Sequence, residues 1–239
     1  MIIFPAIDIK DGKCVRLIKG DFNKMTSYEK SRFDQAKIYF ENGFENIHIV
    51  DLDGALQGKS SNSNIVKEIL KNLKLKIQIG GGIRTINDID NWIKSGVDKV
   101  IIGTAAVENK NFLKNACEKF QNKIALSLDV KDGLIFLSGW KKQTNILASD
   151  FLKEIQNFGV SRIIYTDINK DGTKQGPNIQ DTIALSSKIK IPFIISGGIS
   201  SIGDIKKIKS LNNSNIEGVI VGKSIYDGDI KISELAKEI

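Results

Sequence analysis

The stretch IQIGGGIRTINDI at residues 77–89 returns 116 positions later as FIISGGISSIGDI at residues 193–205. Two further pairs of segments match in the same order along the chain: AIDIKDG (6–12) with SLDVKDG (127–133), and VIIGTAAVEN (100–109) with VIVGKSIYDG (219–228). Three ordered matches, with spacings of 116, 119 and 121 positions, indicate an internal repeat. We therefore expect two halves, about 1–120 and 121–239, that share their chemistry and are related by a pseudo-two-fold axis.

Short apolar runs alternate with helical patterns through both halves. Eight runs are found, at residues 2–8, 46–52, 75–80, 99–103, 123–130, 161–167, 191–196 and 216–222. They are nearly continuous in apolar residues, which is typical of parallel strands buried on both faces. The intervening stretches 64–73, 111–120 and 149–159 carry one apolar face each, and in the last of them Ser149 can cap the helix and Gly159 can end it. The pattern predicts a single (β/α)8 barrel over residues 1–239; a doubly wound open sheet is the alternative, but it does not predict the repeat.

Composition narrows the class of protein. The 239 residues are 41% apolar and 26% charged, and no Pro/Gly/Ser-rich linker divides them. The net charge of +7 comes from scattered lysines without a basic run, which favours a solvated surface or an acidic small molecule as ligand over nucleic acid. No stretch approaches the ~20 apolar residues of a membrane span, and no signal peptide is recognisable. With only Cys14 and Cys117, both expected to be free thiols, we expect a cytoplasmic protein, and we expect a monomer.

Two aspartates close apolar strands at matching positions of the repeat. Asp8 ends the first run and Asp129 ends the fifth, and these strands lie opposite each other in an eight-stranded ring. Because active sites of this barrel lie at the carboxyl ends of the strands, the two carboxylates face each other across one mouth. Such a pair suits a general acid and a general base, so we predict that Asp8 and Asp129 are catalytic. The alternative is that each caps its own turn, because Asp-x-Lys-Asp-Gly is good turn chemistry.

Glycines follow four of the predicted strands in two-fold order. The third and seventh runs are followed by Gly81-Gly82 and Gly197-Gly198, and the fourth and eighth by Gly103-Thr104 and Gly222-Lys223. Glycine lets the backbone approach a ligand closely, and the N–H groups of the next helix can bind an anion. The sequence therefore predicts two phosphate sites on opposite sides of the mouth, and a long substrate with a phosphate at each end.

Further candidates for substrate contact lie in the same loops. Arg84 can bind a phosphate or form a surface ion pair, and Thr166 can face the reacting centre or pack in the core. Trp140 can stack on a planar ring or simply hold its loop in place. Asp171 and Gly172 follow the sixth strand and complete the predicted set.

The polar stretch 19–28 is long for a connection and is predicted to be a mobile lid, together with the loops 131–145 and 169–178. We expect Gly139 to act as a hinge for Trp140. His48, the only histidine, lies inside a strand and is interpreted as a core residue. That leaves no histidine-based triad or histidine-ligated metal site.

These motifs resemble the ProFAR isomerase family of histidine biosynthesis over essentially the whole chain. The segments that carry the resemblance are FPAIDIKDGKCVRLIKGD (4–21), HIVDLDGALQGKSSN (48–62), QIGGGIR (78–84), SLDVKDG (127–133), GW (139–140), DGTKQGPN (171–178), SGGIS (196–200) and VIVGKSIYDG (219–228). The resemblance implies a half-barrel repeat, no metal or organic cofactor, and a substrate with two phosphoribosyl groups. It implies an Amadori rearrangement in which Asp8 is the base at C2 and Asp129 is the acid at the furanose oxygen, with Thr166 beside the acid.

Three other readings remain open at this point. The cyclase subunit of imidazole glycerol phosphate synthase has a similar barrel, but its first strand usually carries Cys before the aliphatic-Asp pair, where this chain has Pro5-Ala6-Ile7-Asp8. A bifunctional isomerase that also serves tryptophan synthesis is the second. A non-catalytic phosphosugar-binding barrel is the third; it would keep the glycine loops but would need neither Asp8 nor Asp129.

Overall fold

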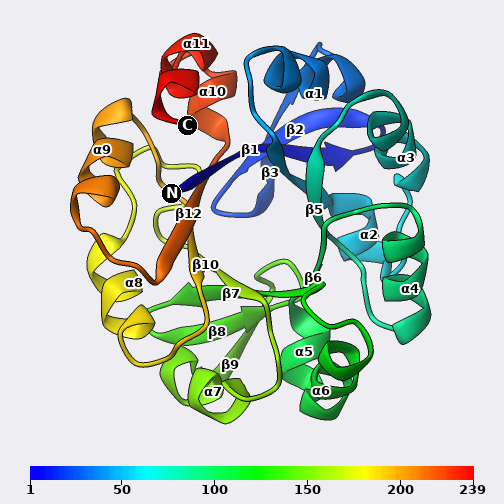
Figure 1. The fold of residues 1–239 in the computed structure, drawn as a ribbon, viewed down its shortest axis with the longest axis vertical. Coiled ribbons are helices and arrows are strands. Elements are labelled where there is room, and N and C mark those ends of the chain that lie inside the picture. The colour runs from blue at the N-terminus through cyan, green and yellow to red at the C-terminus, as the bar shows by residue number, and fades with distance from the viewer.

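Eight parallel strands close into a barrel in the computed structural model, which describes residues 1–239. Around the ring the strands follow the order β10, β11, β12, β1, β4, β5, β6 and β7, and β7 pairs with β10 to close it (Figure 1). Their bounds are β1 Ile2–Lys10, β4 Asn46–Asp51, β5 Lys76–Gly80, β6 Lys99–Ile102, β7 Ile124–Lys131, β10 Arg162–Asp167, β11 Phe193–Ser196 and β12 Ile216–Val221. The predicted (β/α)8 barrel is confirmed, and closure excludes the open sheet.

Apolar side chains cover both faces of the barrel strands. A small cluster including Phe4, Ile101 and Ile220 fills the inside of the ring, while 51 further buried residues lie between the ring and the helices. This division explains why the strand segments read as nearly continuous apolar runs: alternate residues point inward and outward, and both directions are dry.

Helices surround the barrel as the sequence pattern predicts. They are α1 Arg32–Glu41, α2 Leu52–Gln57, α3 Ser63–Asn72, α4 Ile86–Lys94, α5 Thr104–Glu108, α6 Lys110–Lys119, α7 Ala148–Ile155, α8 Ile179–Ser186, α9 Ile202–Ser210, α10 Lys223–Tyr226 and α11 Ile232–Leu235, with a final 3-10 turn at Ala236–Glu238. None of them is both long and apolar enough to cross a membrane.

The repeat extends to the helix caps. Thr85 and Asp88 form a capping box at the start of α4, and Ser201 and Asp204 form the same box at the start of α9. The predicted cap at Ser149 is wrong, because α7 begins one residue earlier and Leu147 occupies its N-cap position without a side-chain hydrogen bond.

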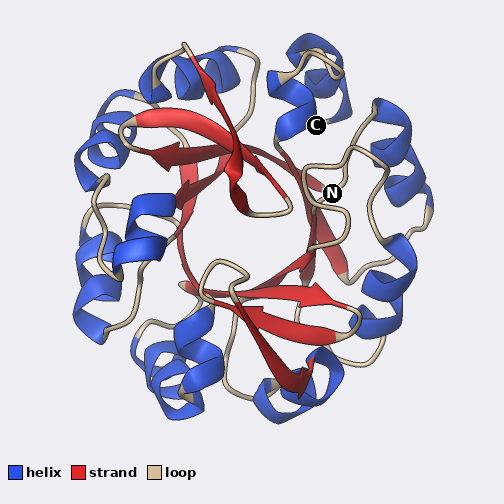
Figure 2. Cartoon of the chain, turned by 180° about the vertical axis from the view of Figure 1, so that it is seen from behind, coloured by secondary structure: helices blue, strands red, loops and turns tan.

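Two hairpins, which the sequence analysis did not predict, extend from opposite strands of the ring. Strands β2 (Lys13–Ile18) and β3 (Asp21–Tyr28) follow β1, and β8 (Leu134–Leu137) and β9 (Lys142–Leu147) follow β7. Figure 2 shows both two-stranded ribbons in front of the barrel mouth, on opposite sides of it.

Most of segment 19–28 is strand β3, and 131–145 is also largely strand, so the predicted lids are hairpins rather than open loops; their mobility remains a prediction. An Asp-Gly pair with positive φ connects each barrel strand to its ribbon, Asp11-Gly12 between β1 and β2 and Asp132-Gly133 between β7 and β8, as two-residue turns between antiparallel strands require. Strand β3 is an edge strand that pairs only with β2, so its polar composition is compatible with an exposed ribbon.

Candidate active site

Every residue predicted for the site lines one cavity of about 290 Å³ at the carboxyl ends of the barrel strands. These residues are Asp8, Gly81, Gly82, Arg84, Gly103, Thr104, Asp129, Trp140, Thr166, Asp171, Gly172, Gly197, Gly198, Gly222 and Lys223. They come from both halves of the chain, so the cavity exists only because the ring closes. Their roles in binding and catalysis remain predictions.

Asp8 lies on the inner face of β1 and is held by an ion pair. The Arg16 guanidinium lies 2.5 Å from its carboxylate, and Arg16 also donates to the carbonyl oxygen of Ala6. Arg16 is buried and stacks over the ring of Tyr226 at 4.7 Å. Burial alone would lower the pKa of Arg16, but the charge and hydrogen bond of Asp8, together with Tyr226 and Tyr39, outweigh it and raise that pKa above its ordinary value. Arg16 thus holds the Asp8 carboxylate in one orientation at the cavity wall.

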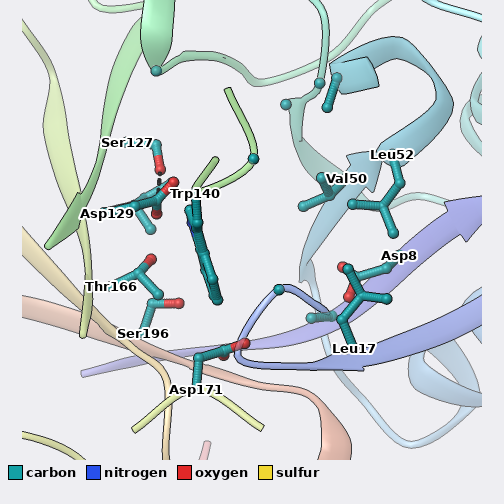
Figure 3. Close-up of a pocket in the computed structure, with 18 of the residues that line it drawn as sticks. Asp8, Leu17, Val50, Leu52, Ser127, Asp129, Trp140, Thr166, Asp171 and Ser196 are labelled. Carbon is teal, nitrogen blue, oxygen red and sulfur yellow. Dashed lines mark hydrogen bonds between the residues drawn. The ribbon is translucent and has the colours of Figure 1, made fainter. Parts of the chain in front are cut away.

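Asp129 occupies a different environment on the opposite side of the ring. It lies beside Thr166 in the register of β7 and β10, and the Ser127 hydroxyl is 3.4 Å from its carboxylate (Figure 3). Burial raises its pKa, and hydrogen bonding from Trp140, Thr166 and Ser127 only partly opposes this. No basic side chain neutralises Asp129, in contrast to Asp8. Neither aspartate accepts a hydrogen bond from the backbone of its turn, so turn capping does not account for them.

Asp171 is the third carboxyl group of the cavity. Burial raises its pKa to about 7, the negative charges of Asp8 and Asp129 raise it as well, and Arg16 opposes them. The backbone of its loop is fixed, because Asp171 donates its N–H to the carbonyl of Asp167 and accepts from the N–H of Lys19 at 3.2 Å. A pKa near 7 lets Asp171 both donate and accept a proton at neutral pH.

Trp140 stands inside the cavity between Asp129 on one side and Asp8 on the other (Figure 3). It and Gly139 both have positive φ, at 68° and 63°. Its ring lies against Gly20 at the tip of the β2–β3 hairpin, where a Cβ atom would come within 2.3 Å of the ring. The indole is therefore available to stack on a planar group, and Gly20 is a site residue that the sequence analysis missed.

The glycine loop after β5 brings the backbone to the cavity wall. Gly81 and Gly82 have φ of 112° and 72°, and a Cβ on either would lie 2.1 to 2.3 Å from backbone oxygens of the β4–α2 segment. Any side chain there would displace that segment, which explains the need for glycine. The Thr104 hydroxyl accepts from the N–H of Ser138, which ties this loop to the one that carries Trp140. Arg84 lies against Gly58, and its guanidinium forms no ion pair with a carboxylate.

The loop after β11 repeats this geometry on the opposite side. Gly197 and Gly198 have φ of 89° and 87°, and a Cβ on Gly198 would lie 2.4 Å from the carbonyl oxygen of Gly176. The residues that precede α5 and α10 share an unusual backbone: φ, ψ are −111°, −100° at Gly103 and −122°, −96° at Gly222. Both halves therefore present the first turn of a short helix to the cavity in the same way.

Two buried aspartates support the loops around the site, and the sequence analysis missed their role. Asp51 accepts from the backbone of Gly54, Ser61 and Asn62 and from the side chain of Asn62. Asp167 accepts from the Asn169 backbone and the Asn178 side chain. In both halves the asparagine follows the aspartate by 11 positions. This matched spacing is visible in the sequence and could have identified the pair.

His48 is buried, as predicted, and it also lines the cavity. Burial, with a contribution from the charge of Arg16, lowers its pKa to about 3, so the ring is neutral and lies 3.1 Å from the Gln78 amide. No three His, Cys, Asp or Glu side chains lie close enough together to hold a metal ion.

Comparison with known proteins gives one family over nearly the whole chain. The family model described as "Histidine biosynthesis protein" matches residues 2–231. A protein of Pelagibacter ubique is 61% identical over 239 residues, covering 100% of this chain and 99% of the relative. Proteins of Oceanobacillus iheyensis and Parvibaculum lavamentivorans are 45% and 46% identical, covering 98% and 99% of this chain and 97% and 98% of the relatives. All three bear the name 1-(5-phosphoribosyl)-5-((5-phosphoribosylamino)methylideneamino) imidazole-4-carboxamide isomerase.

Proposed function

The chain belongs to the family of histidine biosynthesis proteins, and from this premise we propose that it isomerises the compound named in its relatives, converting an aminoaldose into an aminoketose. The observation that carries the proposal is the 61% identity over the full length to a protein with that name. The cavity supports it independently, because it places carboxyl groups between two glycine loops suited to phosphate.

The rearrangement needs one base and one acid. In the open-ring imine, the base removes the proton from C2, the electron pair forms the C1–C2 double bond of an enaminol, and a proton returns to C1 as C2 becomes a ketone. Before that, an acid must protonate the furanose oxygen so that the C1–O bond can break. We assign the base to Asp8, because its ion pair with Arg16 fixes it as an oriented carboxylate.

The acid has two candidates in the cavity. Asp129 is the one that the sequence predicts, and its raised pKa and the adjacent Thr166 support it. Asp171 is favoured by a separate observation, since a pKa of about 7 lets it donate a proton at neutral pH and take it back. An acid role for Asp171 predicts that kcat falls as the pH rises through about 7, and that this dependence is lost in Asp171→Asn.

The substrate has a phosphate at each end, and the two-fold arrangement of the glycine loops supports two anion sites. We place one phosphate at Gly82 and Thr104, with Arg84 near it, and the other at Gly198 and Lys223. We propose that Trp140, which stands in the cavity, stacks on the planar imidazole between them. Phosphates at opposite rims then hold the reacting sugar over the carboxyl groups.

The chain is further proposed to act as a monomer in the cytoplasm. The exposed large apolar side chains, such as Phe40, Leu56, Leu147 and Ile239, come from different helices, strands and the carboxyl end of the chain. Both cysteines are free and buried, which fits a reducing compartment. Sedimentation velocity tests the monomer directly, and a dimer at micromolar concentration would contradict it.

The experiment that tests the function is a direct assay of purified protein with three substrates. We expect isomerisation of the aminoaldose and no cyclisation of the aminoketose in the presence of ammonia. The corresponding substrate of tryptophan synthesis is the third, and its turnover decides whether the enzyme is bifunctional. Cyclisation without isomerisation would contradict the proposal, as would binding of the aminoaldose without turnover.

A further inference from the structure

We propose that Asp227 is a positioning residue that ties the loop of Asp171 and the β2–β3 hairpin to the phosphate loop at Gly222-Lys223. The proposal rests on the isomerase function above, and it adds a link between one phosphate site and the reacting centre. Asp227 follows α10 directly and does not line the cavity itself.

Three side chains from three separate segments meet at the Asp227 carboxylate. The Lys174 ammonium lies 3.0 Å away, the Lys223 ammonium lies 3.1 Å away, and the Tyr28 hydroxyl donates to it at 2.8 Å. Burial alone would raise the pKa of Asp227, but hydrogen bonds from Lys174, Tyr28 and Lys223 hold it below the ordinary value. The carboxylate is 21% exposed and accepts from donors of all three segments, so it connects them at one point.

Two of these segments carry residues that face the reacting centre. Lys174 lies three positions after Asp171 in the same loop. Tyr28 ends β3, whose partner strand β2 supplies Arg16 to the ion pair with Asp8. The same two segments touch again at their tips, where the N–H of Lys19 donates to the carbonyl of Asp171. Lys174 also pairs with Asp229 at 2.7 Å, so the Asp171 loop is connected to the segment after α10 through two carboxylates.

The third segment is the phosphate loop. Lys223 begins α10 beside Gly222, and both Lys174 and Lys223 line the cavity. Asp227 therefore holds two cations where the second phosphate is proposed to bind. Its own negative charge lies behind them and weakens their attraction for that phosphate. Removal of this charge should disturb the Asp171 loop without weakening phosphate binding.

The internal repeat supplies a matched control at Glu108. In the pair VIIGTAAVEN and VIVGKSIYDG, Glu108 aligns with Asp227, and it likewise ends the short helix after a phosphate loop. Glu108 has a single partner, Lys142 on β9, at 3.7 Å, and its side chain is 50% exposed. The position is equivalent, but the three-way connection is absent.

The test compares Asp227→Asn with Glu108→Gln, and includes Lys174→Met and the double variant Asp227→Asn/Lys174→Met. For Asp227→Asn we expect kcat to fall about tenfold with KM unchanged or lower, since misplacement of a catalytic group by about 1 Å can cost about 10²-fold. Glu108→Gln should stay within about twofold of the unchanged enzyme. The two changes share the Lys174–Asp227 ion pair, so the double variant should lose less kcat than the product of the two single losses.

Hydrogen exchange without substrate provides a readout that does not depend on turnover. Residues 169–178 should exchange faster in Asp227→Asn than in the unchanged protein, while the barrel strands should not. If the unchanged chain isomerises and Asp227→Asn keeps kcat within twofold, the proposal is overturned. It is also overturned if KM of Asp227→Asn rises by a larger factor than kcat falls. A loss of kcat in the double variant equal to the product of the two single losses overturns it as well. An unchanged chain that fails to isomerise instead removes the proposed function, and the exchange comparison still decides whether Asp227 holds the loop. Should Asp227→Asn not fold, Lys174→Met must show the same loss of kcat and the same faster exchange.

Discussion

Asp171→Asn should make the protein more stable at alkaline pH and leave it nearly unchanged at acid pH. The pKa of Asp171 is raised from 3.8 to about 7, chiefly by burial and also by the charges of Asp8 and Asp129. Between these two values the folded protein holds a proton that the unfolded chain has already released. Stability therefore falls as the pH rises through this window, and the loss is complete above the folded pKa.

The size of the effect follows from the shift. Three units at 1.36 kcal/mol each correspond to a destabilisation on the order of 4 kcal/mol when Asp171 is ionised. At pH 4.5 only about 1 kcal/mol of this is present, so the gain from Asp171→Asn should grow by roughly 3 kcal/mol between pH 4.5 and pH 8. The Asp171 side chain makes neither a hydrogen bond nor an ion pair, so the amide should lose no contact.

Urea unfolding of both proteins at the two pH values measures this difference. Asp8→Asn is the control with the opposite sign, because it leaves Arg16 buried without its partner and should destabilise the protein at pH 8. If the difference between Asp171→Asn and the unchanged protein were the same at pH 4.5 and pH 8, the raised pKa of Asp171, and with it the second candidate for the acid, would have to be abandoned.

Three further outcomes are expected. Trp140→Ala should weaken binding of a substrate analogue by roughly 1–3 kcal/mol, on the scale of aromatic stacking on bases; calorimetry that finds an unaltered Kd would refute the stacking role. Gly198→Ala should raise KM at least about tenfold, since its Cβ would lie 2.4 Å from the carbonyl oxygen of Gly176, whereas Gly139→Ala, with open space around its Cβ, should affect KM less; equal KM values would contradict this reading. A saturating analogue should slow hydrogen exchange in segments 19–28, 131–145 and 169–178 and leave the strands unchanged, and exchange unaltered in all three would end the idea that they close over substrate.

The barrel and the members of its site could be predicted because the relevant signals are local. Apolar runs closed by Asp8 or by Gly81-Gly82 identify strand ends, and in this fold the strand ends converge on one mouth. The repeat then doubled each signal, so that a glycine pair too weak to interpret alone became one of four matched positions.

The hairpins and the residues that support the site could not be predicted in the same way. The polar segment 21–28 has no apolar alternation, because β3 is an edge strand and half of its side chains are exposed. Arg16 lies among apolar neighbours, and only the register Asp8 to Val15 across the Asp11-Gly12 turn brings it to Asp8. The Asp11-Gly12 turn is recognisable in the sequence, so the pairing of Asp8 with Val15 could have been predicted from it.

Other contacts depend on segments distant in the sequence. Gly20 meets Trp140, and Tyr28 meets Asp227, only because the hairpin folds back over the mouth. No local sequence pattern predicts contacts between segments so far apart in the chain. The pKa values of Asp171 and Asp129 likewise depend on burial and on which charges surround each group, which a sequence does not contain.

Single-turnover rates of Asp8→Asn with the aminoaldose substrate test the central claim most directly. Asp8 is placed as the base that removes the C2 proton, and the amide keeps its shape without its basicity. We predict that the chemical step slows by at least about 10²-fold while the Kd of a substrate analogue changes little. A chemical step within a few-fold of the unchanged enzyme would contradict the acid-base account of this cavity.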